Sequence, residues 1–153
     1  MEQTRWLDDD EMRLFRAFLA ASSGVTSRLD VLLKESSGIS LDDYEVLVFL
    51  SEAADQRLRM SELSNHLLHS RSRLTQRVDR LVKRGLVERE KCDSDARGTW
   101  AVLTPLGMSE LEKAAPRHLE HVRTYLFDQL QAGETAELAD VLERLAAAAR
   151  TAN

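Results

Sequence analysis

The spacing of hydrophobic residues follows the helical repeat along most of the chain and changes only between residues 86 and 103. Elsewhere, apolar residues recur every three or four positions, which is typical of amphipathic helices. Residues 86–91 and 99–103 are short, β-prone runs on either side of a turn-rich segment, residues 92–98. This pattern predicts a two-stranded hairpin. The chain is therefore expected to be mainly helical, with one small β element.

Capping signals define the first two helices. An amphipathic helix is expected over residues 10–33, with acidic residues able to cap its start and Gly38 beyond its end. Ser40 followed by Asp43 resembles a capping box, so a second helix is expected from there to about Ala54.

Two shorter helices are expected before the hairpin. Ser61 can cap a brief third helix, and Ser70 can cap a fourth helix over residues 71–84. Gly85 then provides the left-handed conformation that ends this fourth helix. A short helix, a turn and a second capped helix are the order of a helix-turn-helix motif.

The C-terminal third predicts two more helices. Thr104 and Pro105 are expected to cap and start a long fifth helix, which bends near Pro116 and ends at Gly133. A sixth helix follows. The apolar stripes of the first, fifth and sixth helices are too extensive for one small module to cover, so a two-fold dimer is expected.

The charge of the chain is unevenly distributed. The net charge is -5, yet residues 57–97 contain 11 Lys and Arg against 6 Asp and Glu, while the rest contains 10 against 20. A basic segment between acidic flanks indicates a local site for a polyanion such as DNA. The single cysteine excludes an internal disulfide.

The fourth predicted helix carries side chains suited to reading DNA. Arg73 and Arg77 are of the type that binds guanine through two hydrogen bonds, and Gln76 can bind adenine in the same way. Ser70 and Ser72 suit phosphates. A solvated charged surface is the alternative. The DNA-binding residues predicted on this helix and its cap are Ser70, Ser72, Arg73, Thr75, Gln76, Arg77 and Arg80.

Two segments resemble a known family. Residues 63–75 and 80–89 are similar to the recognition segment of the MarR (multiple antibiotic resistance regulator) family. Residues 93–98 and 102–104 resemble the wing signature of that family, D-x-R followed by V-x-L-T or a near variant of it. Leu68 and His69 depart from the usual turn, which often has glycine and then an apolar residue. Since element order and length also fit, the resemblance covers essentially the whole chain.

The resemblance implies a winged helix-turn-helix fold with six helices and a hairpin wing, dimeric through its N- and C-terminal helices. Arg97 would enter the minor groove from the wing, and Asp95 would orient it by a salt bridge. A narrow minor groove concentrates negative potential, which favours a guanidinium held in place.

The resemblance also implies how the chain is divided and what it does. Within a single domain, residues 1–153, the DNA-binding lobe would be residues 40–104, with dimerisation helices at residues 8–36 and 105–150. The expected function is a cytoplasmic repressor that binds a pseudo-palindromic double-stranded DNA operator as a homodimer. A small aromatic or phenolic effector would release it. A winged-helix protein-interaction module without DNA binding is the alternative.

Other candidate sites are weaker. Phe15, Tyr44 and Trp100 could line an effector pocket, although aromatic residues at helical spacing are more often core, and Trp100 is expected to pack against the fourth helix. Cys92, beside Lys91, is a candidate for oxidation sensing. Two pairs of histidines three residues apart could each supply two metal ligands, which do not make a site; they are His66 with His69 and His118 with His121. No cofactor, metal or enzymatic activity is expected, because the sequence carries no catalytic motif.

Overall fold

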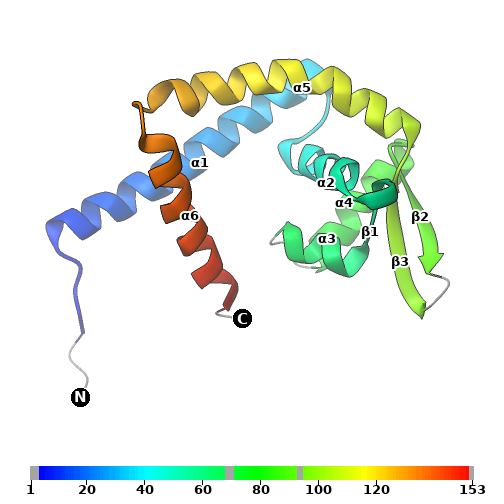
Figure 1. The fold of residues 1–153 in the computed structure, drawn as a ribbon, viewed down its shortest axis with the longest axis horizontal. Coiled ribbons are helices and arrows are strands. Elements are labelled where there is room, and N and C mark those ends of the chain that lie inside the picture. Colours follow the sequence, from blue (N-terminus) through cyan, green and yellow to red (C-terminus); the bar gives the residue numbers. More distant parts are fainter. Residues whose placement is uncertain (1–3, 68–70, 93–94, 152–153) are drawn as a thin grey trace.

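The structure is a computed structural model that describes residues 4–67, 71–92 and 95–151. It is mainly helical with one small antiparallel sheet, as predicted (Figure 1). The elements in chain order are α1 (Asp9–Ser37), α2 (Leu41–Glu52), a 3-10 turn (Ala54–Gln56), β1 (Arg57–Arg59), α3 (Met60–His66), α4 (Arg71–Lys83), β2 (Val87–Cys92), β3 (Asp95–Leu103), α5 (Pro105–Tyr125), a second 3-10 turn (Phe127–Gln129) and α6 (Glu134–Thr151).

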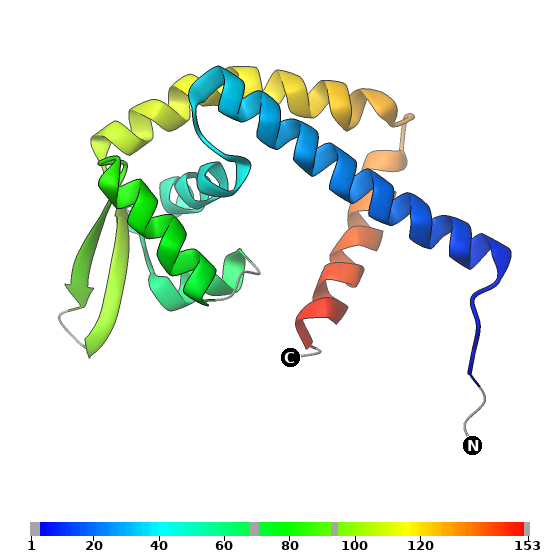
Figure 2. The same cartoon turned by 180° about the vertical axis from the view of Figure 1, so that it is seen from behind.

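Two long helices form a scaffold for the rest of the chain. α1 and α5 lie side by side in both views (Figures 1 and 2). A compact lobe of α2, α3, α4 and the sheet lies beneath one end of this pair, and α6 descends from the other end. None of the helices that the structure describes is long and apolar enough to span a bilayer.

The sheet has three strands, not two. Its order is β1-β3-β2, with β3 antiparallel to both neighbours. Leu58 of β1 pairs with Ala101, and Val87 of β2 pairs with Leu103. The predicted two-stranded hairpin was therefore incomplete, because the three residues of β1 carry no strand pattern of their own. The predicted turn was also too long, since β3 already begins at Asp95.

The core lies inside the lobe, where the helices pack against one another and against the sheet. Buried apolar side chains from α1 to α5 and from the strands meet there. Burying side chains of this size contributes about 1.5 to 3 kcal/mol each. The largest fully buried ones are Leu33, Ile39, Val46, Leu47, Leu50, Leu63, Leu74, Val78, Leu81 and Val87.

Several predicted caps are confirmed. Ser40 Oγ accepts a hydrogen bond from the backbone N–H of Asp43 at 3.1 Å, at the start of α2. Gly38 and Gly85 adopt φ of 69° and 71°, the left-handed conformation that ends α1 and follows α4. The predicted cap at Ser61 is wrong, because α3 begins at Met60 and Ser61 lies inside its first turn.

The start of α5 is tied to the end of α4. Thr104 Oγ1 accepts a hydrogen bond from Gly107 N at 2.9 Å and donates one to the Gly85 carbonyl at 2.7 Å. The predicted cap at Thr104 is therefore confirmed. The predicted end at Gly133 is wrong: α5 ends at Tyr125, after passing through Pro116.

Candidate nucleic-acid interface

α4 presents polar side chains to solvent and apolar ones to the core. The apolar side chains that it buries are Leu74, Val78 and Leu81. Residues near the N-terminus of such a helix are the ones that reach base edges in a major groove. The predicted DNA-binding residues that are exposed in this part of α4 are Ser72, Arg73, Thr75 and Gln76.

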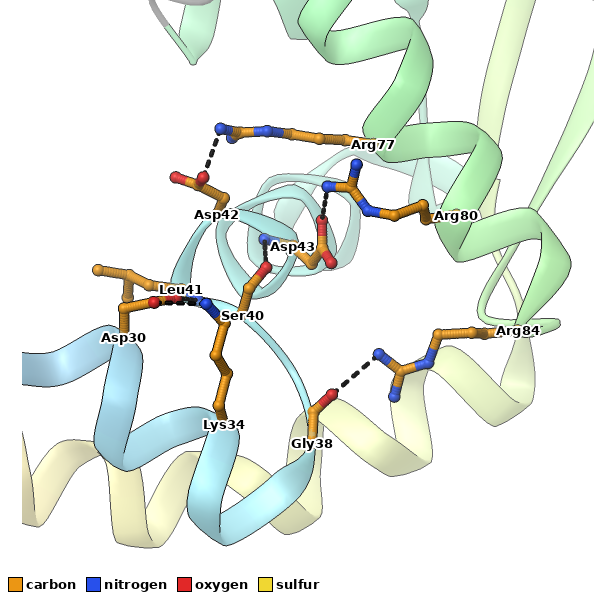
Figure 3. Close-up of polar contacts among 10 residues, drawn as sticks. All are labelled: Asp30, Lys34, Gly38, Ser40, Leu41, Asp42, Asp43, Arg77, Arg80 and Arg84. Carbon is orange, nitrogen blue, oxygen red and sulfur yellow. Dashed lines mark hydrogen bonds and ion pairs between the residues drawn. The ribbon is translucent and has the colours of Figure 1, made fainter. Parts of the chain in front are cut away.

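Arg77 does not belong to this exposed group, although the sequence predicted that it reads guanine. Its residue surface is only 8% exposed. Its Nη2 donates a hydrogen bond to Asp42 Oδ2 of α2 (Figure 3). The guanidinium is turned toward α2, where a carboxylate compensates its charge. The predicted contact of Arg77 with guanine stays a prediction.

Two more arginines, one on α4 and one just after it, contact the start of α2 and the segment that joins α2 to α1. Arg80 Nη2 lies 3.2 Å from Oδ1 of Asp43, a carboxylate whose side chain is 9% exposed. Arg84 Nη1 donates to the Gly38 carbonyl at 3.1 Å. Arg80, predicted on the DNA-facing side, thus extends toward α2 (Figure 3). The carboxylates of α2 were missed as partners of α4.

The α1–α2 junction has its own polar contacts. Asp30 Oδ1 accepts a hydrogen bond from the backbone N–H of Leu41 at 2.9 Å. Its Oδ2 lies 2.6 Å from Lys34 Nζ. The hydrogen bond from Lys34 is the main cause that lowers the pKa of Asp30, which keeps this carboxylate charged. The start of α2, where Asp42 and Asp43 lie, is thereby fixed to α1.

Several predicted residues lie outside what the structure describes. They include Ser70, the predicted cap of α4, and the two turn residues Leu68 and His69. The backbone of Asp95 and Arg97 belongs to β3, whereas their side chains lie outside the described part. The proposed salt bridge between these two residues stays a prediction.

The ring of Trp100 contacts two arginine side chains of β1. The guanidinium carbons of Arg57 and Arg59 lie 5.1 and 5.4 Å from the centroid of its ring. These are cation–π distances. The sequence did not predict these contacts with β1, and the predicted packing of Trp100 against α4 stays a prediction.

A polar hollow of about 390 Å³ lies between the start of α3, α4 and the sheet. Arg59, Thr75, Arg89 and Gly98 are among the residues that line it. Arg89 donates to the Thr75 carbonyl at 3.3 Å and pairs with Asp79 at 2.9 Å. Thr75 thus faces the space between α4 and the wing.

The other candidate groups that the structure describes lie on different elements. Phe15 is half exposed on α1, whereas Tyr44 is buried with its ring centroid 4.6 Å from that of His118. His66 stacks on Phe49 at 5.2 Å. Within residues 4–67, 71–92 and 95–151, no group of three or more His, Cys, Asp or Glu side chains is placed to hold a metal ion.

Comparisons with known proteins agree on one family. The family model described as the MarR family matches residues 37–98. Sco3205, a MarR family transcriptional regulator from Streptomyces coelicolor solved in complex with DNA, is 37% identical, with 94% of this chain and 90% of that chain covered and a TM-score of 0.91. AbsC, a MarR family regulator from the same organism, is 38% identical, with 97% and 99% covered and a TM-score of 0.90.

Curated relatives are transcriptional regulators, not enzymes. The transcriptional repressor MprA of Escherichia coli is 31% identical over 106 residues. This match covers 69% of the chain and 60% of MprA, so the chain spans less than two thirds of that relative.

Proposed function

The chain belongs to the MarR family of transcriptional regulators, and on this premise we propose that it represses transcription by binding double-stranded DNA sequence-specifically as a homodimer. The observation that carries the proposal is the exposed N-terminal part of α4, where Ser72, Arg73 and Gln76 project from a helix whose opposite face is buried. This helix lies in the basic segment, residues 57–97, of an otherwise acidic chain.

Each subunit would place α4 in a major groove. Arg73 and Gln76 would contact base edges, Ser70 and Ser72 would contact phosphates, and Arg97, oriented by Asp95, would enter the flanking minor groove. Two subunits related by a two-fold axis would read half-sites about one helical turn apart. The operator is accordingly pseudo-palindromic.

The homodimer is supported by apolar side chains that one chain leaves exposed. α1 exposes Leu14, Phe15 and Phe18, which lie at helical spacing. α6 lies at the far end of the scaffold from the lobe (Figure 1). It exposes a second apolar stripe. A second copy would bury both surfaces. The exposed apolar residues of α6 are Leu138, Val141, Leu142 and Leu145.

The proposed function assigns DNA binding and dimerisation to different parts of the chain. Residues 40–104 form the DNA-binding lobe, while residues 8–36 and 105–150 form the dimerisation helices of a single domain, residues 1–153. The protein acts in the cytoplasm, where its DNA is. A small aromatic or phenolic effector would shift it to a state with lower affinity for DNA.

A binding measurement tests the function. Fluorescence anisotropy with a fragment from upstream of a neighbouring gene should detect a specific complex. If the dimer makes roughly 6 to 10 phosphate contacts, affinity should fall about 10³- to 10⁵-fold between 50 and 200 mM salt. A dimer that binds none of these fragments at low salt would favour the alternative, a winged-helix protein-interaction module without DNA binding.

The residue-level prediction concerns Arg73. Replacing Arg73 by Ala should lower specific affinity by about 1 to 3 kcal/mol, because a contact with a base edge is lost. The control is Arg117→Ala, which removes the same charge from an exposed position on α5. Equal effects of the two substitutions would show that only net charge matters and would contradict the role of α4.

A further inference from the structure

We infer that Arg77 is a positioning residue: its ion pair with Asp42 fixes α4 on α2 and thereby sets how the exposed residues of α4 meet DNA, with no DNA contact of its own. The inference rests on the proposed function and deepens it. It assigns a separate task to a residue whose type alone suggests base reading.

The burial of Arg77 requires an anion. Its side chain is 10% exposed, whereas the side chain of its partner Asp42 is 52% exposed. A guanidinium cannot release its proton, so its charge stays in place on burial and needs a carboxylate nearby. To reach a base edge, Arg77 would have to leave Asp42. The geometry therefore separates Arg77 from the exposed arginine one turn earlier, Arg73.

An ion pair at this point controls the rotation of α4 about its axis. The apolar face of α4 is held by contacts that have no preferred direction, which leaves some freedom of rotation. The hydrogen bond from Arg77 to Asp42 is directional, and the bond from Arg80 to Asp43 repeats it one turn later. Recognition of base edges requires placement within about 0.5 Å and 10–20°. Two directional bonds to α2 supply this restraint.

The surroundings of Arg77 do not suit a phosphate. Asp42 and Asp43, at the start of α2, face the arginines of α4 (Figure 3). Glu45 is close enough to Asp42 and Arg77 to interact with both electrostatically. Burial raises the pKa of Glu45, Asp42 raises it further, and Arg77 opposes the rise. Arg77 thus lies among carboxylates, which would repel the DNA backbone. Asp42 is also next to the α1–α2 junction, so the Arg77–Asp42 ion pair connects α4 to α1, one of the helices proposed to form the dimer.

The substitution Asp42→Asn gives opposite results for a positioning and a contacting Arg77. If Arg77 positions α4, losing the carboxylate should lower affinity for the specific site roughly 5-fold or more and leave affinity for unrelated DNA within about 2-fold. If Arg77 contacts DNA, removing Asp42 frees it and also removes a negative charge, so affinity should rise. Asn is nearly isosteric at this half-exposed position, which keeps the fold.

A matched control and a second variant complete the test. Glu52→Gln removes the same charge from the other end of α2 and should leave both affinities unchanged. Arg77→Met should reproduce the loss of specificity with the salt dependence of specific binding unchanged, whereas loss of a phosphate contact would reduce its slope by about 1. The double variant Asp42→Asn/Arg77→Met should lose no more affinity for the specific site than either single variant, because both substitutions break the same ion pair.

The outcomes are distinguishable. Wild-type protein that binds no DNA overturns the proposed function and this inference together. Wild-type binding with an Asp42→Asn variant that binds as tightly or more tightly overturns the inference alone. The inference is also overturned if Asp42→Asn lowers thermal stability but leaves the ratio of affinity for specific DNA to affinity for unrelated DNA unchanged among folded dimers. A purely structural role of the ion pair would give that result.

Discussion

At Gly107 the start of α5 approaches the turn after α4 so closely that no side chain fits. A Cβ built on Gly107 would lie 2.1 Å from the Leu86 carbonyl oxygen and 2.8 Å from Cδ1 of Leu103. Both distances are far below van der Waals contact, and one partner is backbone. The Gly107 N–H also donates a hydrogen bond to Oγ1 of Thr104, the cap of α5.

Gly107→Ala should therefore lower the free energy of unfolding by at least about 1 to 3 kcal/mol, because overpacking outweighs the gain in helix propensity. Gly24→Ala is the control, since a Cβ there meets no atom of the chain within 4 Å. In that helix the same substitution should be neutral or stabilise by up to about 1 kcal/mol. Chemical denaturation of both variants measures the difference. Equal effects would contradict the close contact.

Arg77 shows where sequence reasoning about the site reaches its limit. Its position, three after Leu74 and four before Leu81, places it beside the apolar stripe of α4, which was a signal that it is not fully exposed. The partner is Asp42, 35 residues earlier, and no local pattern connects the two. Ser72, Arg73, Thr75 and Gln76 were placed correctly at the surface because exposure on an amphipathic helix follows from periodicity alone.

At the scale of elements, capping signals close to each helix predicted where helices start. The same local signals could not predict a strand that forms by pairing with a distant segment. The starts of α1, α2 and α5 follow from caps within a few residues of each helix. β1 was missed because its three residues become a strand only by pairing with β3, more than 40 residues later. The early end of α5 was missed because the apolar pattern runs on through the 3-10 turn after it.

The packing of α5 on α2 makes stability depend on pH. The ring of His118 is buried against Tyr44. Burial lowers the pKa of His118, and the nearby His121 lowers it further. Below the ordinary value of 6.5 the unfolded chain binds a proton that the folded chain does not, so stability falls as pH falls through that value.

Between pH 7.5 and 5.5, wild-type protein should lose stability at up to about 1.4 kcal/mol per pH unit from this residue. His118→Phe keeps an aromatic ring against Tyr44 and removes the titrating group. The variant should therefore lose less stability than the wild type over the same pH range. Denaturation curves at several pH values give the comparison. Parallel pH profiles for the two proteins would exclude a role for His118.

At the scale of the whole molecule, the apolar stripe of α6 has a direct test. Leu142→Glu should raise the dimer dissociation constant roughly 30-fold or more, because at least about 2 kcal/mol of apolar burial is lost and a charge is introduced. Sedimentation at several concentrations measures this, and affinity for a two-half-site DNA should fall with it.

Ala147→Glu provides the matched control for Leu142→Glu. It introduces the same charge on the opposite face of α6, so the dimer should persist. Monomers in both variants, or in neither, would show that this stripe does not join the subunits.

The contact between Trp100 and the two arginines of β1 has a practical consequence for optical spectroscopy. The chain has two tryptophans, and the other, Trp6, is 83% exposed near the N-terminus. Replacing Trp6 by Phe would leave one indole, in contact with two guanidinium groups of β1. Its emission would then report on the sheet alone, so movement of the wing during binding could be followed without any attached dye.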